Sequence, residues 1–353
     1  MSKGKVTDKD GISVEILKAG GITMYKAIAQ RFSHYLRSSK IPSVWKESNT
    51  ILLHKKGDTE DLKNYRPICL LGHLYKLFTR IIYNRLNRTL DEQQPKGQAG
   101  FRGEHSTMDH IFVLNQMIER ARELPLCLVF VDFEKAFDNV EINAVLNGLK
   151  SQGVKVSYIK ILVEANSGYT TDINVFCSPI TIPIAKGVRQ GDTISPKLFA
   201  ACLESVFRKI SWRGGVNIDG EVLTHLRFAY DIVILANDTQ TAQEMLLQSN
   251  EESKAVGLKL SISKTKHMRS DERTHASIQL NGEAVEEVNS FTYLGQVLDM
   301  HHKTNEEISR RCMAGWRAFN SIKEVLEKLS KPEDRALLFN STVVPSMLYG
   351  SET

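Results

Sequence analysis

The chain has 353 residues, of which 42% are hydrophobic and 25% charged, and its formal net charge is +5. This length predicts two or three packed units, and the composition is that of an ordinary globular protein, which excludes disordered, collagen-like and disulfide-scaffold chains. No apolar run reaches the length of a membrane span and no signal peptide precedes the first folded-looking segment, so we expect a soluble intracellular chain.

The charge is distributed unevenly along the chain. Residues 1–125 carry 21 Lys and Arg against 13 Asp and Glu, whereas residues 126–353 carry 25 against 28. This asymmetry is expected when one part of a chain binds a polyanion and another part collects carboxylates. It favours nucleic acid or nucleotide as the partner, although solvated helix faces explain the same pattern equally well.

The cysteines are scattered, and no two have CxxC spacing. An odd number without paired spacing argues against a zinc ribbon or a disulfide framework and predicts small, buried side chains in a reducing compartment. The five positions are Cys69, Cys127, Cys177, Cys202 and Cys312. His301 and His302 precede the last of them without a second thiol, so we interpret both as surface residues.

The first 125 residues predict mainly helices. Helical spacing of apolar residues indicates helices over residues 14–19, 22–36, 71–90 and 110–122, and Ser106, Thr107 and Asp109 are predicted to cap the last one. Between them, TILLHKKGD predicts a short strand with a basic turn, NYRP a break, and GQAGFRGEHST a glycine-rich loop or hairpin. The helix over residues 71–90 carries its cations on its polar side: Lys76, Arg80, Arg85 and Arg88.

The central third predicts an α+β layout with a sheet in the middle of the chain. LCLVFVDF is typical of a buried strand that ends in an acidic residue, and LTHLRFAYDIVILAND predicts two apolar strands that meet at a turn containing Tyr230 and Asp231. Further helices are predicted over 142–152, 156–166 and 197–210, and further strands over 171–176 and 181–185. From about residue 300 the pattern is nearly all helical, and its end at Thr353 favours a truncated helical unit.

Asp132 and Asp138 flank the segment FEKAF after the central strand. A carboxylate at the end of a buried strand costs free energy unless a cation or hydrogen bonds compensate it, which makes Asp132 a candidate metal ligand. The alternative is that such aspartates cap the following helix, and for Asp138, directly before a turn into a helix, capping is the main expectation.

The segment GVRQGDTISPKLF is a second candidate cluster. Its two glycines, Gly187 and Gly191, allow close approach of the backbone, and Arg189 and Gln190 supply donors. Asp192, Ser195 and Pro196 are expected to start a helix, and a well-capped helix start is the alternative explanation of the whole segment.

Taken in order, FVDFEKAFD, RQGD..SP and FA.D resemble the palm of reverse transcriptases. The resemblance is greatest to non-LTR (LINE-type) retrotransposons, in their RTE-like branch, and it runs over nearly the whole chain. Further matching segments are GISVEILKAG, WKESNTILLHKKGD, NYRPICLLGHLYKLFTRII, GQAGFRGEHSTMDHI, GLKLSISKTKHM and FTYLGQVL. The resemblance implies a right-hand polymerase of the α+β class, with fingers and an N-terminal extension over 1–125, a palm with an antiparallel sheet over 126–299, and a partial, truncated helical thumb over 300–353.

The resemblance further implies an RNA-directed DNA polymerase, a nucleotidyltransferase that uses an RNA template, a DNA primer and dNTPs. In this reaction two divalent cations, Mg²⁺ or Mn²⁺, stabilise the attacking and leaving oxygens. Asp132 and Asp231 match the family's metal-binding carboxylates, and the backbone carbonyl of Phe133 lies next to the first of them. Asp231 matches the second aspartate of the family's FADD turn, which has the less direct role at the metal.

Other residues match positions that handle the nucleotide in that family. Phe137 matches the steric gate that favours dNTPs over rNTPs, although the pattern suits a core phenylalanine equally well, and Gln190 matches a residue near the incoming nucleotide and the template. Three cations lie in the fingers motifs, and one or more of them holds the triphosphate: Arg66, Lys76 and Arg102. Two lysines are possible proton donors to pyrophosphate: Lys264 and Lys266. For each of these two lysines, a solvated helix or strand face is the more common role.

Tyr230 stands where the family has the first aspartate of FADD. A neutral phenol with a pKa near ~10 is a poor magnesium ligand. The loss of one charged ligand predicts a severely reduced or absent polymerase activity, roughly a thousandfold for ~4 kcal/mol.

Two further departures favour a fragment or decayed copy. Asp8 and Lys9 replace the Gly and Pro of the family's opening GPDG, and we expect the upstream endonuclease that such elements usually carry, and the rest of the thumb, to be missing. Three hypotheses follow: an RNA-directed DNA polymerase, a non-catalytic nucleic-acid binder, and a genomic relic. A nuclear location is expected only from what such elements do.

Overall fold

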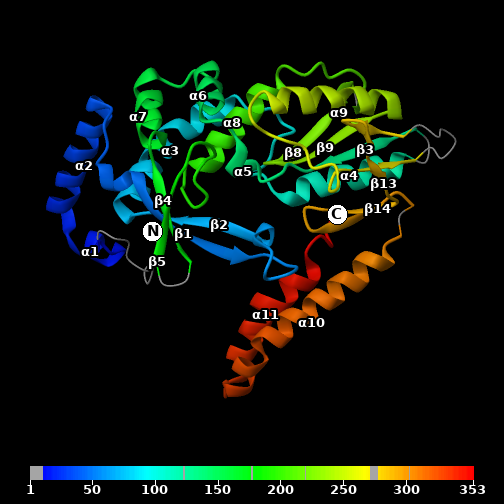
Figure 1. Cartoon of the computed structure of the whole chain (residues 1–353). Coiled ribbons are helices and arrows are strands. Elements are labelled where there is room, and N and C mark those ends of the chain that lie inside the picture. The colour runs from blue at the N-terminus through cyan, green and yellow to red at the C-terminus, as the bar shows by residue number, and fades with distance from the viewer. Residues whose placement is uncertain (1–10, 122–123, 176–177, 219, 271–276, 302) are drawn as a thin grey trace. The chain divides into compact units, whose positions relative to one another are not determined.

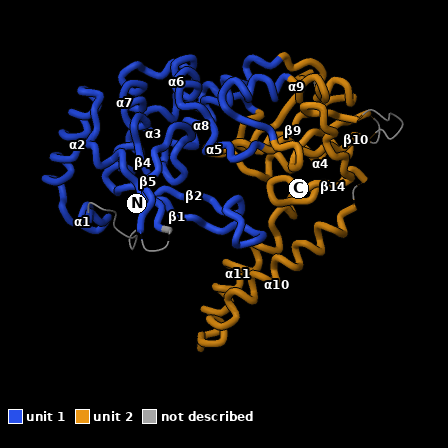
Figure 2. The backbone as a smooth tube through the Cα atoms, viewed as in Figure 1, with its two compact units in different colours: residues 1–96, 133–210, 248–260 blue, residues 97–132, 211–247, 261–353 orange. Residues whose placement is uncertain are grey.

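The computed structural model describes residues 11–121, 124–175, 178–218, 220–270, 277–301 and 303–353. The chain packs into two compact units (Figure 2), each assembled from segments that are far apart in the sequence. Unit 1 comprises residues 1–96, 133–210 and 248–260, and unit 2 comprises residues 97–132, 211–247 and 261–353. The division at residues 125 and 299 stays a prediction.

A four-stranded sheet forms the centre of unit 1, in the order β2–β1–β4–β5 (Figure 1). Its strands are β1 (Glu47–His54), β2 (Tyr65–Leu70), β4 (Thr170–Val175) and β5 (Ser178–Pro183). β1 pairs antiparallel with β2 and parallel with β4. The predicted strands near residues 171–185 therefore exist, but they join the N-terminal strand and not the sheet of the central motif.

The prediction of a break at NYRP was wrong, because Pro67 lies inside β2 and pairs with Leu52. β2 is an edge strand, where the missing N–H of a proline breaks no ladder between two neighbours.

The helices of unit 1 confirm the periodicity of the sequence. All six predicted helices are present, with ends within three residues of the prediction, as α1 (Val14–Ala19), α2 (Gly21–Ser38), α3 (His73–Glu92), α6 (Ile142–Ser151), α7 (Val156–Asn166) and α8 (Ser195–Phe207). Short turns of helix add α5 (Ala136–Asn139), η1 (Ser43–Lys46) and η2 (Leu62–Asn64). Aromatic rings link α2, η1 and α3: Phe32 meets Phe78 at 5.1 Å and Trp45 at 6.1 Å between ring centroids.

Unit 2 is built on a five-stranded sheet in the order β13–β10–β3–β9–β8. Its strands are β3 (Cys127–Val131), β8 (His225–Phe228), β9 (Asp231–Ala236), β10 (Lys266–Arg269) and β13 (Glu286–Glu287). Every residue of β3 is buried, as the apolar run predicts. Helix α4 (Thr107–Arg120) packs Leu114 and Ile118 onto one face of this sheet, and the predicted cap is confirmed as a capping box between Ser106 and Asp109.

The rest of unit 2 consists of short strand pairs and two long helices. The pairs are β6 (Val216–Ile218) with β7 (Glu221–Leu223), β11 (Gln279–Leu280) with β12 (Glu283–Ala284), and β14 (Ser290–Tyr293) with β15 (Gln296–Asp299). The helical end is confirmed as α10 (Asn305–Lys328) and α11 (Pro332–Leu348), which pack side by side (Figure 1). Among the described residues, no helix is both long enough and apolar enough to span a membrane.

Helix α9 (Thr239–Lys254) was not predicted. Its sequence is mostly polar, and in its first half only a narrow set of apolar side chains is buried: Ala242, Met245 and Leu246. So narrow a stripe gives a weak helical signal.

The described cysteines are free thiols. Cys127 and Cys202 are buried as predicted and Cys69 is half-buried, but Cys312 is exposed on α10, so the expectation of burial was wrong there. His301 is exposed, as expected. Cys177, His302, Asp8 and Lys9 lie outside the described residues.

Candidate active site

The strand ladder of unit 2 places Asp132 and Asp231 opposite each other. In the antiparallel pair of β3 and β9, Val131 faces Ile232, so the next position of the ladder sets Asp132 across from Asp231. Because side chains alternate along a strand, both carboxylates lie on the same face of the sheet as the core residue Phe130. The two predicted metal ligands therefore meet at the end of two buried strands.

The two carboxylates raise each other's cost of ionisation, and Asp231 shows this most clearly. Burial, and after it the charge of Asp132, raises the pKa of Asp231 to about 6. Oδ1 of Asp132 is buried and has no hydrogen-bond partner. Two adjacent carboxylates, of which Asp231 is largely buried, favour a bound cation. Within the described residues no group of three or more His, Cys, Asp or Glu side chains surrounds a possible metal position.

The structure separates the two candidate proton donors. Nζ of Lys264 lies 3.5 Å from Oδ1 of Asp132, and its side chain is 67% exposed. Lys266, in β10, instead forms an ion pair of 2.5 Å with Glu286 of β13. Of the two lysines, therefore, only Lys264 lies beside the carboxylates, and its role as a proton donor stays a prediction.

Tyr230 lies in a turn of two residues between β8 and β9. Phe228 pairs with Asp231, so Ala229 and Tyr230 form the loop, one residue earlier than the predicted turn at Tyr230 and Asp231, and Asp231 begins β9. The φ of Ala229 is 61°, in the left-handed region that suits the first position of a tight hairpin turn but is unusual for alanine. The turn thus keeps Asp231 as its closing residue and presents a phenol next to it.

The GQAGF loop supports this turn. The N–H of Ala99 donates to the carbonyl of Arg227 at 3.0 Å, and a Cβ on Gly100 would lie 2.1 Å from the backbone nitrogen of Ala229. Only glycine fits at position 100. The sequence indicated a glycine-rich loop here, but not that the loop packs under the turn.

Tyr293 is a buried neighbour of the carboxylates that the sequence analysis did not assign to the site. Burial, with a smaller contribution from the charge of Asp231, raises the pKa of Tyr293. Its hydroxyl lies 3.4 Å from Nδ1 of His110, whose pKa burial lowers to about 4. The motif FTYLGQVL contains this tyrosine, but no local pattern predicts that it meets residues from α4 and β9.

Two motif residues of unit 1, Gln190 and Asp138, form a pair. Nε2 of Gln190 donates to Oδ1 of Asp138 at 2.6 Å. Burial raises the pKa of Asp138, and the hydrogen bond from Gln190 opposes this. Asp138 lies inside α5, and Glu141 is the N-cap of the following helix, α6, so the capping prediction was wrong. Gly187 allows the close approach expected of it, because a Cβ there would lie 2.7 Å from the carbonyl oxygen of Asp138.

Arg189 fixes the loop that carries Gln190. Its side chain is 2% exposed and donates to the carbonyls of Trp45 and Ala165 at 3.1 and 2.6 Å. The guanidinium also lies 4.2 Å from the ring centroid of Tyr169, a cation–π contact. Arg189 is therefore a structural donor, and the neighbouring Gln190 projects from a rigid backbone.

Asp192 holds the same loop from its other end. It accepts hydrogen bonds from the hydroxyls of Tyr75 and Thr79 of α3, at 3.1 and 2.8 Å. α8 then begins at Ser195 with Pro196 in its first turn, as predicted.

Phe137 stacks on Phe199 of α8, with 4.9 Å between ring centroids and 14° between ring planes. Phe199 is fully buried, whereas Phe137 is half-buried. The core therefore holds one side of the Phe137 ring while part of it stays accessible, and its role as a steric gate stays a prediction.

The candidate nucleotide-binding cations are spread over both units. Arg66 is exposed on β2 and Lys76 is half-buried on α3, both in unit 1, whereas Arg102 belongs to unit 2 and donates to the carbonyl of Gln98 at 2.8 Å. Phe133 is buried, and its backbone forms an isolated bridge with Leu260 in unit 1. The roles of these four residues stay predictions.

Comparison with protein families gives a match of residues 53–298 to the reverse transcriptase (RNA-dependent DNA polymerase) family. Among individual proteins, the chain is 26% identical over 364 residues to the Pol polyprotein of the type-1 retrotransposable element R2 from Popillia japonica, covering 99% of this chain and 49% of that protein. It is also 26% identical to the RNA-directed DNA polymerase of the mobile element jockey from Drosophila melanogaster, covering 92% of this chain and 37% of that protein. The chain thus spans about half, or less, of the length of these relatives.

Solved structures of telomerase share the fold. Apo telomerase from Candida tropicalis matches with a TM-score of 0.53 and 12% identity, covering 87% of this chain and 57% of that chain. The same enzyme in complex with a TWJ fragment of telomeric RNA matches with a TM-score of 0.50 and 14% identity, covering 79% of this chain and 47% of that one. The mixed helices and sheets are consistent with the predicted α+β polymerase fold.

Proposed function

The chain belongs to the reverse transcriptase (RNA-dependent DNA polymerase) family, as a reverse transcriptase domain of non-LTR retrotransposons, and we propose that its nucleotide-addition chemistry is impaired by Tyr230. One observation carries this proposal: Asp132 and Asp231 oppose each other at the end of β3 and β9, and a tyrosine occupies the turn residue that precedes Asp231. The two strands that position the acidic residues are present, but Tyr230 stands where the proposal expects one of those residues.

The carboxylate pair fits the divalent ions that reverse transcriptases generally use. Its oxygens are hard ligands, Asp231 is largely buried, and Oδ1 of Asp132 is buried without a hydrogen-bond partner. Bound Mg²⁺ or Mn²⁺ would stabilise the attacking and leaving oxygens at the transferred phosphorus. In this chain Asp132, Asp231 and the carbonyl of Phe133 would hold such ions together with substrate phosphates, and the phenol of Tyr230 would add no charge.

The remaining roles follow from the same proposal. Gln190, held by Asp138, contacts the incoming nucleotide and template, and Phe137 excludes the ribose 2′-hydroxyl, so that dNTPs are preferred. Lys264, beside Asp132, protonates pyrophosphate. The phosphates of the nucleotide are bound by cations of the basic N-terminal part: Arg66, Lys76 and Arg102.

An RNA template and a DNA primer are the partners that this function requires. The basic first third of the chain and the similarity of fold to a telomerase solved with an RNA fragment support an RNA partner. The proposal also includes the RTE-like branch, the division into fingers, palm and partial thumb, and a nuclear location, which imaging of a tagged chain in cells would test.

Primer extension by the natural chain and its Tyr230→Asp variant tests the proposal. With an RNA template, a DNA primer, dNTPs and Mg²⁺, we expect the variant to extend roughly a thousandfold faster, which corresponds to ~4 kcal/mol of transition-state stabilisation. Tyr230→Phe is the matched control, because it keeps the ring and supplies no carboxylate, and it should extend as slowly as the natural chain. Equal rates for the natural chain and Tyr230→Asp would contradict the impairment.

A non-catalytic nucleic-acid binder is the alternative that the phenol at position 230 favours. It predicts that neither protein extends the primer, while both bind a template–primer duplex with an affinity that falls steeply with salt. Absence of binding at low salt would leave the genomic relic.

A further inference from the structure

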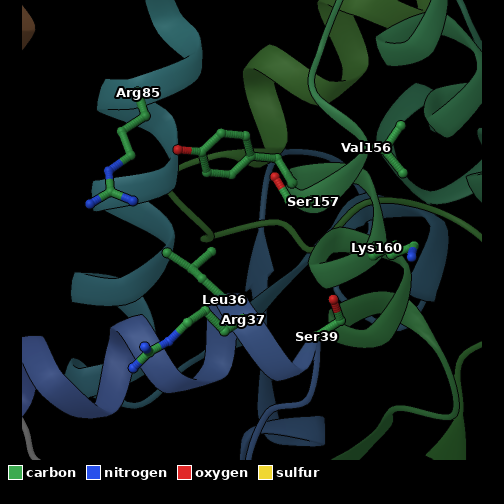
Figure 3. Close-up of a pocket in the computed structure, with 8 residues that line it drawn as sticks. Leu36, Arg37, Ser39, Arg85, Val156, Ser157 and Lys160 are labelled. Atoms are coloured by element: carbon green, nitrogen blue, oxygen red, sulfur yellow. The ribbon is translucent and has the colours of Figure 1, made fainter.

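A surface cavity of about 500 Å³ lies in unit 1 between α2, α3 and α7, and none of its lining residues belongs to the proposed polymerase site. Arg37 comes from α2, Arg85 from α3 and Lys160 from α7. Figure 3 shows the two arginines on one side of the cavity and Lys160 on the opposite side. Three helices that are distant in sequence thus each contribute one cation to the same depression.

No carboxylate neutralises this cavity. α2 contains no Asp or Glu, and no acidic residue lines the depression. The acidic residues of α3 and α7 bind cations elsewhere: Asp91 with Lys197, Glu92 with Arg88, and Glu164 with Lys46. Within the described part of the chain, Arg37, Arg85 and Lys160 form no ion pair, so the lining of the cavity carries a net positive charge.

The other lining groups suit a nucleotide and not a bare anion. The aromatic ring of Tyr158, the apolar Val156 and the hydroxyls of Ser39 and Ser157 also line the cavity. An aromatic ring stacks with an unpaired base, guanidinium groups bind phosphate oxygens with two parallel hydrogen bonds, and hydroxyls can bond a ribose 2′-hydroxyl.

We propose that this cavity binds a single-stranded segment of RNA, with Arg37, Arg85 and Lys160 on its phosphates and Tyr158 against a base. All three cations are exposed, so a continuous strand can enter and leave along the surface. The proposal rests on the proposed function only in that the chain handles RNA. It adds a second contact with the RNA strand, made by residues that take no part in nucleotide addition.

Binding of a fluorescein-labelled single-stranded RNA to the full chain, followed by anisotropy over a range of salt concentrations, tests this assignment. The variant Arg37→Ala/Arg85→Ala should weaken binding at least about tenfold and reduce the slope of log K against log salt by about 1.4, because each phosphate contact on a single strand contributes about 0.7. The matched control is Arg31→Ala/Arg88→Ala, which removes one exposed arginine from each of the same two helices outside the cavity and should retain the natural slope. Thermal unfolding of both variants verifies that they fold.

Three outcomes would overturn the proposal. The first is an unchanged affinity and salt slope in Arg37→Ala/Arg85→Ala, and the second is an equal loss in the control variant. The third is binding of AMP or inorganic phosphate that competes fully with the RNA at similar concentrations, which would assign the cavity to a free nucleotide or phosphate. Primer extension distinguishes failure of this proposal from failure of the proposed function. A chain that does not extend a primer can still bind RNA, and removal of the cavity arginines, but not of the control arginines, should then weaken that binding.

Discussion

Asp138 of unit 1 and Asp231 of unit 2 are both partly buried carboxylates whose pKa is raised by burial, but their surroundings differ. Asp138 accepts a hydrogen bond of 2.6 Å from Gln190, which opposes the effect of burial. Asp231 faces a second carboxylate, Asp132, which adds to the effect of burial. The first carboxylate accepts a hydrogen bond from the protein, whereas the second has a like charge beside it, which favours a bound cation.

Under the proposed function, this difference marks where the chain departs from its family. Around Asp138, the loop that carries Gln190 contains the buried Arg189, and Gln190 has Asp138 as its hydrogen-bond acceptor. No contact in this loop conflicts with the expected role of Gln190 beside the nucleotide. Around Asp231, the backbone of the turn is intact, supported by Gly100, and the change is confined to the side chain of Tyr230. We therefore attribute the proposed loss of activity to one missing carboxylate and not to a damaged fold, and the thousandfold gain expected for Tyr230→Asp is the largest effect that this comparison predicts.

Replacement of Arg189 should damage the intact region most. Arg189→Ala leaves two buried carbonyls, of Trp45 and Ala165, without donors and opens a cavity against Tyr169, so we expect the free energy of unfolding to fall by about 3 kcal/mol. Urea denaturation measures this. Arg31→Ala, an exposed arginine of the same unit, should change stability by less than about 0.5 kcal/mol. A loss below about 1 kcal/mol for Arg189→Ala would show that the loop does not depend on this side chain.

The sequence predicted the elements of both regions and the residues that flank them. Periodicity located α6 and α7, and the apolar run located β3, since these signals are local. The ordered motifs also identified Asp132 and Asp231 before the ladder placed them together.

What escaped prediction depends on partners that are distant in the chain. Strands β4 and β5 join β1 and not the central sheet, and Pro67 is tolerated because β2 lies at an edge. Asp138 bonds Gln190, 52 residues away, instead of capping α5. No local pattern records such pairings, because register and edge position are properties of the assembled sheet.

Gly100 tests whether the altered turn still has a defined backbone. A methyl group at this position would meet the backbone of Ala229 at 2.1 Å, and backbone atoms cannot move aside as a flexible side chain can. We expect Gly100→Ala to lower the free energy of unfolding by about 2–3 kcal/mol in thermal or urea denaturation.

Gly103 of the same loop provides the matched control for this prediction. A Cβ there has nothing within 4 Å, so Gly103→Ala should be nearly neutral. Equal stability of the two variants would mean that the loop does not pack under the turn, and the turn could then no longer be described as intact.

Asp231→Asn gives the smallest and most specific test, through the pH dependence of stability. The pKa of Asp231 is about 6 in the folded chain and 3.8 is its ordinary value, so the folded state binds more protons than the unfolded state between these values. The contribution of this group therefore makes the chain less stable as the pH rises from about 4 to 6, and by less than about 3 kcal/mol in total. Asn cannot ionise, so we expect Asp231→Asn to be more stable than the natural chain by about 2 kcal/mol at pH 7.5 and equally stable near pH 4, when both are measured without divalent ions.

Two comparisons show whether this gain comes from an uncompensated carboxylate pair. Asp138→Asn should reduce the pH dependence of stability over the same range less than Asp231→Asn does, because Gln190 already opposes the rise in the pKa of Asp138. Mg²⁺ should stabilise the natural chain at pH 7.5 and not Asp231→Asn, because a cation binds the folded carboxylate pair in preference to the unfolded chain. If Asp231→Asn were instead less stable at pH 7.5 and unaffected by pH, Asp231 would be a satisfied carboxylate like Asp138, and the contrast between the two regions would not hold.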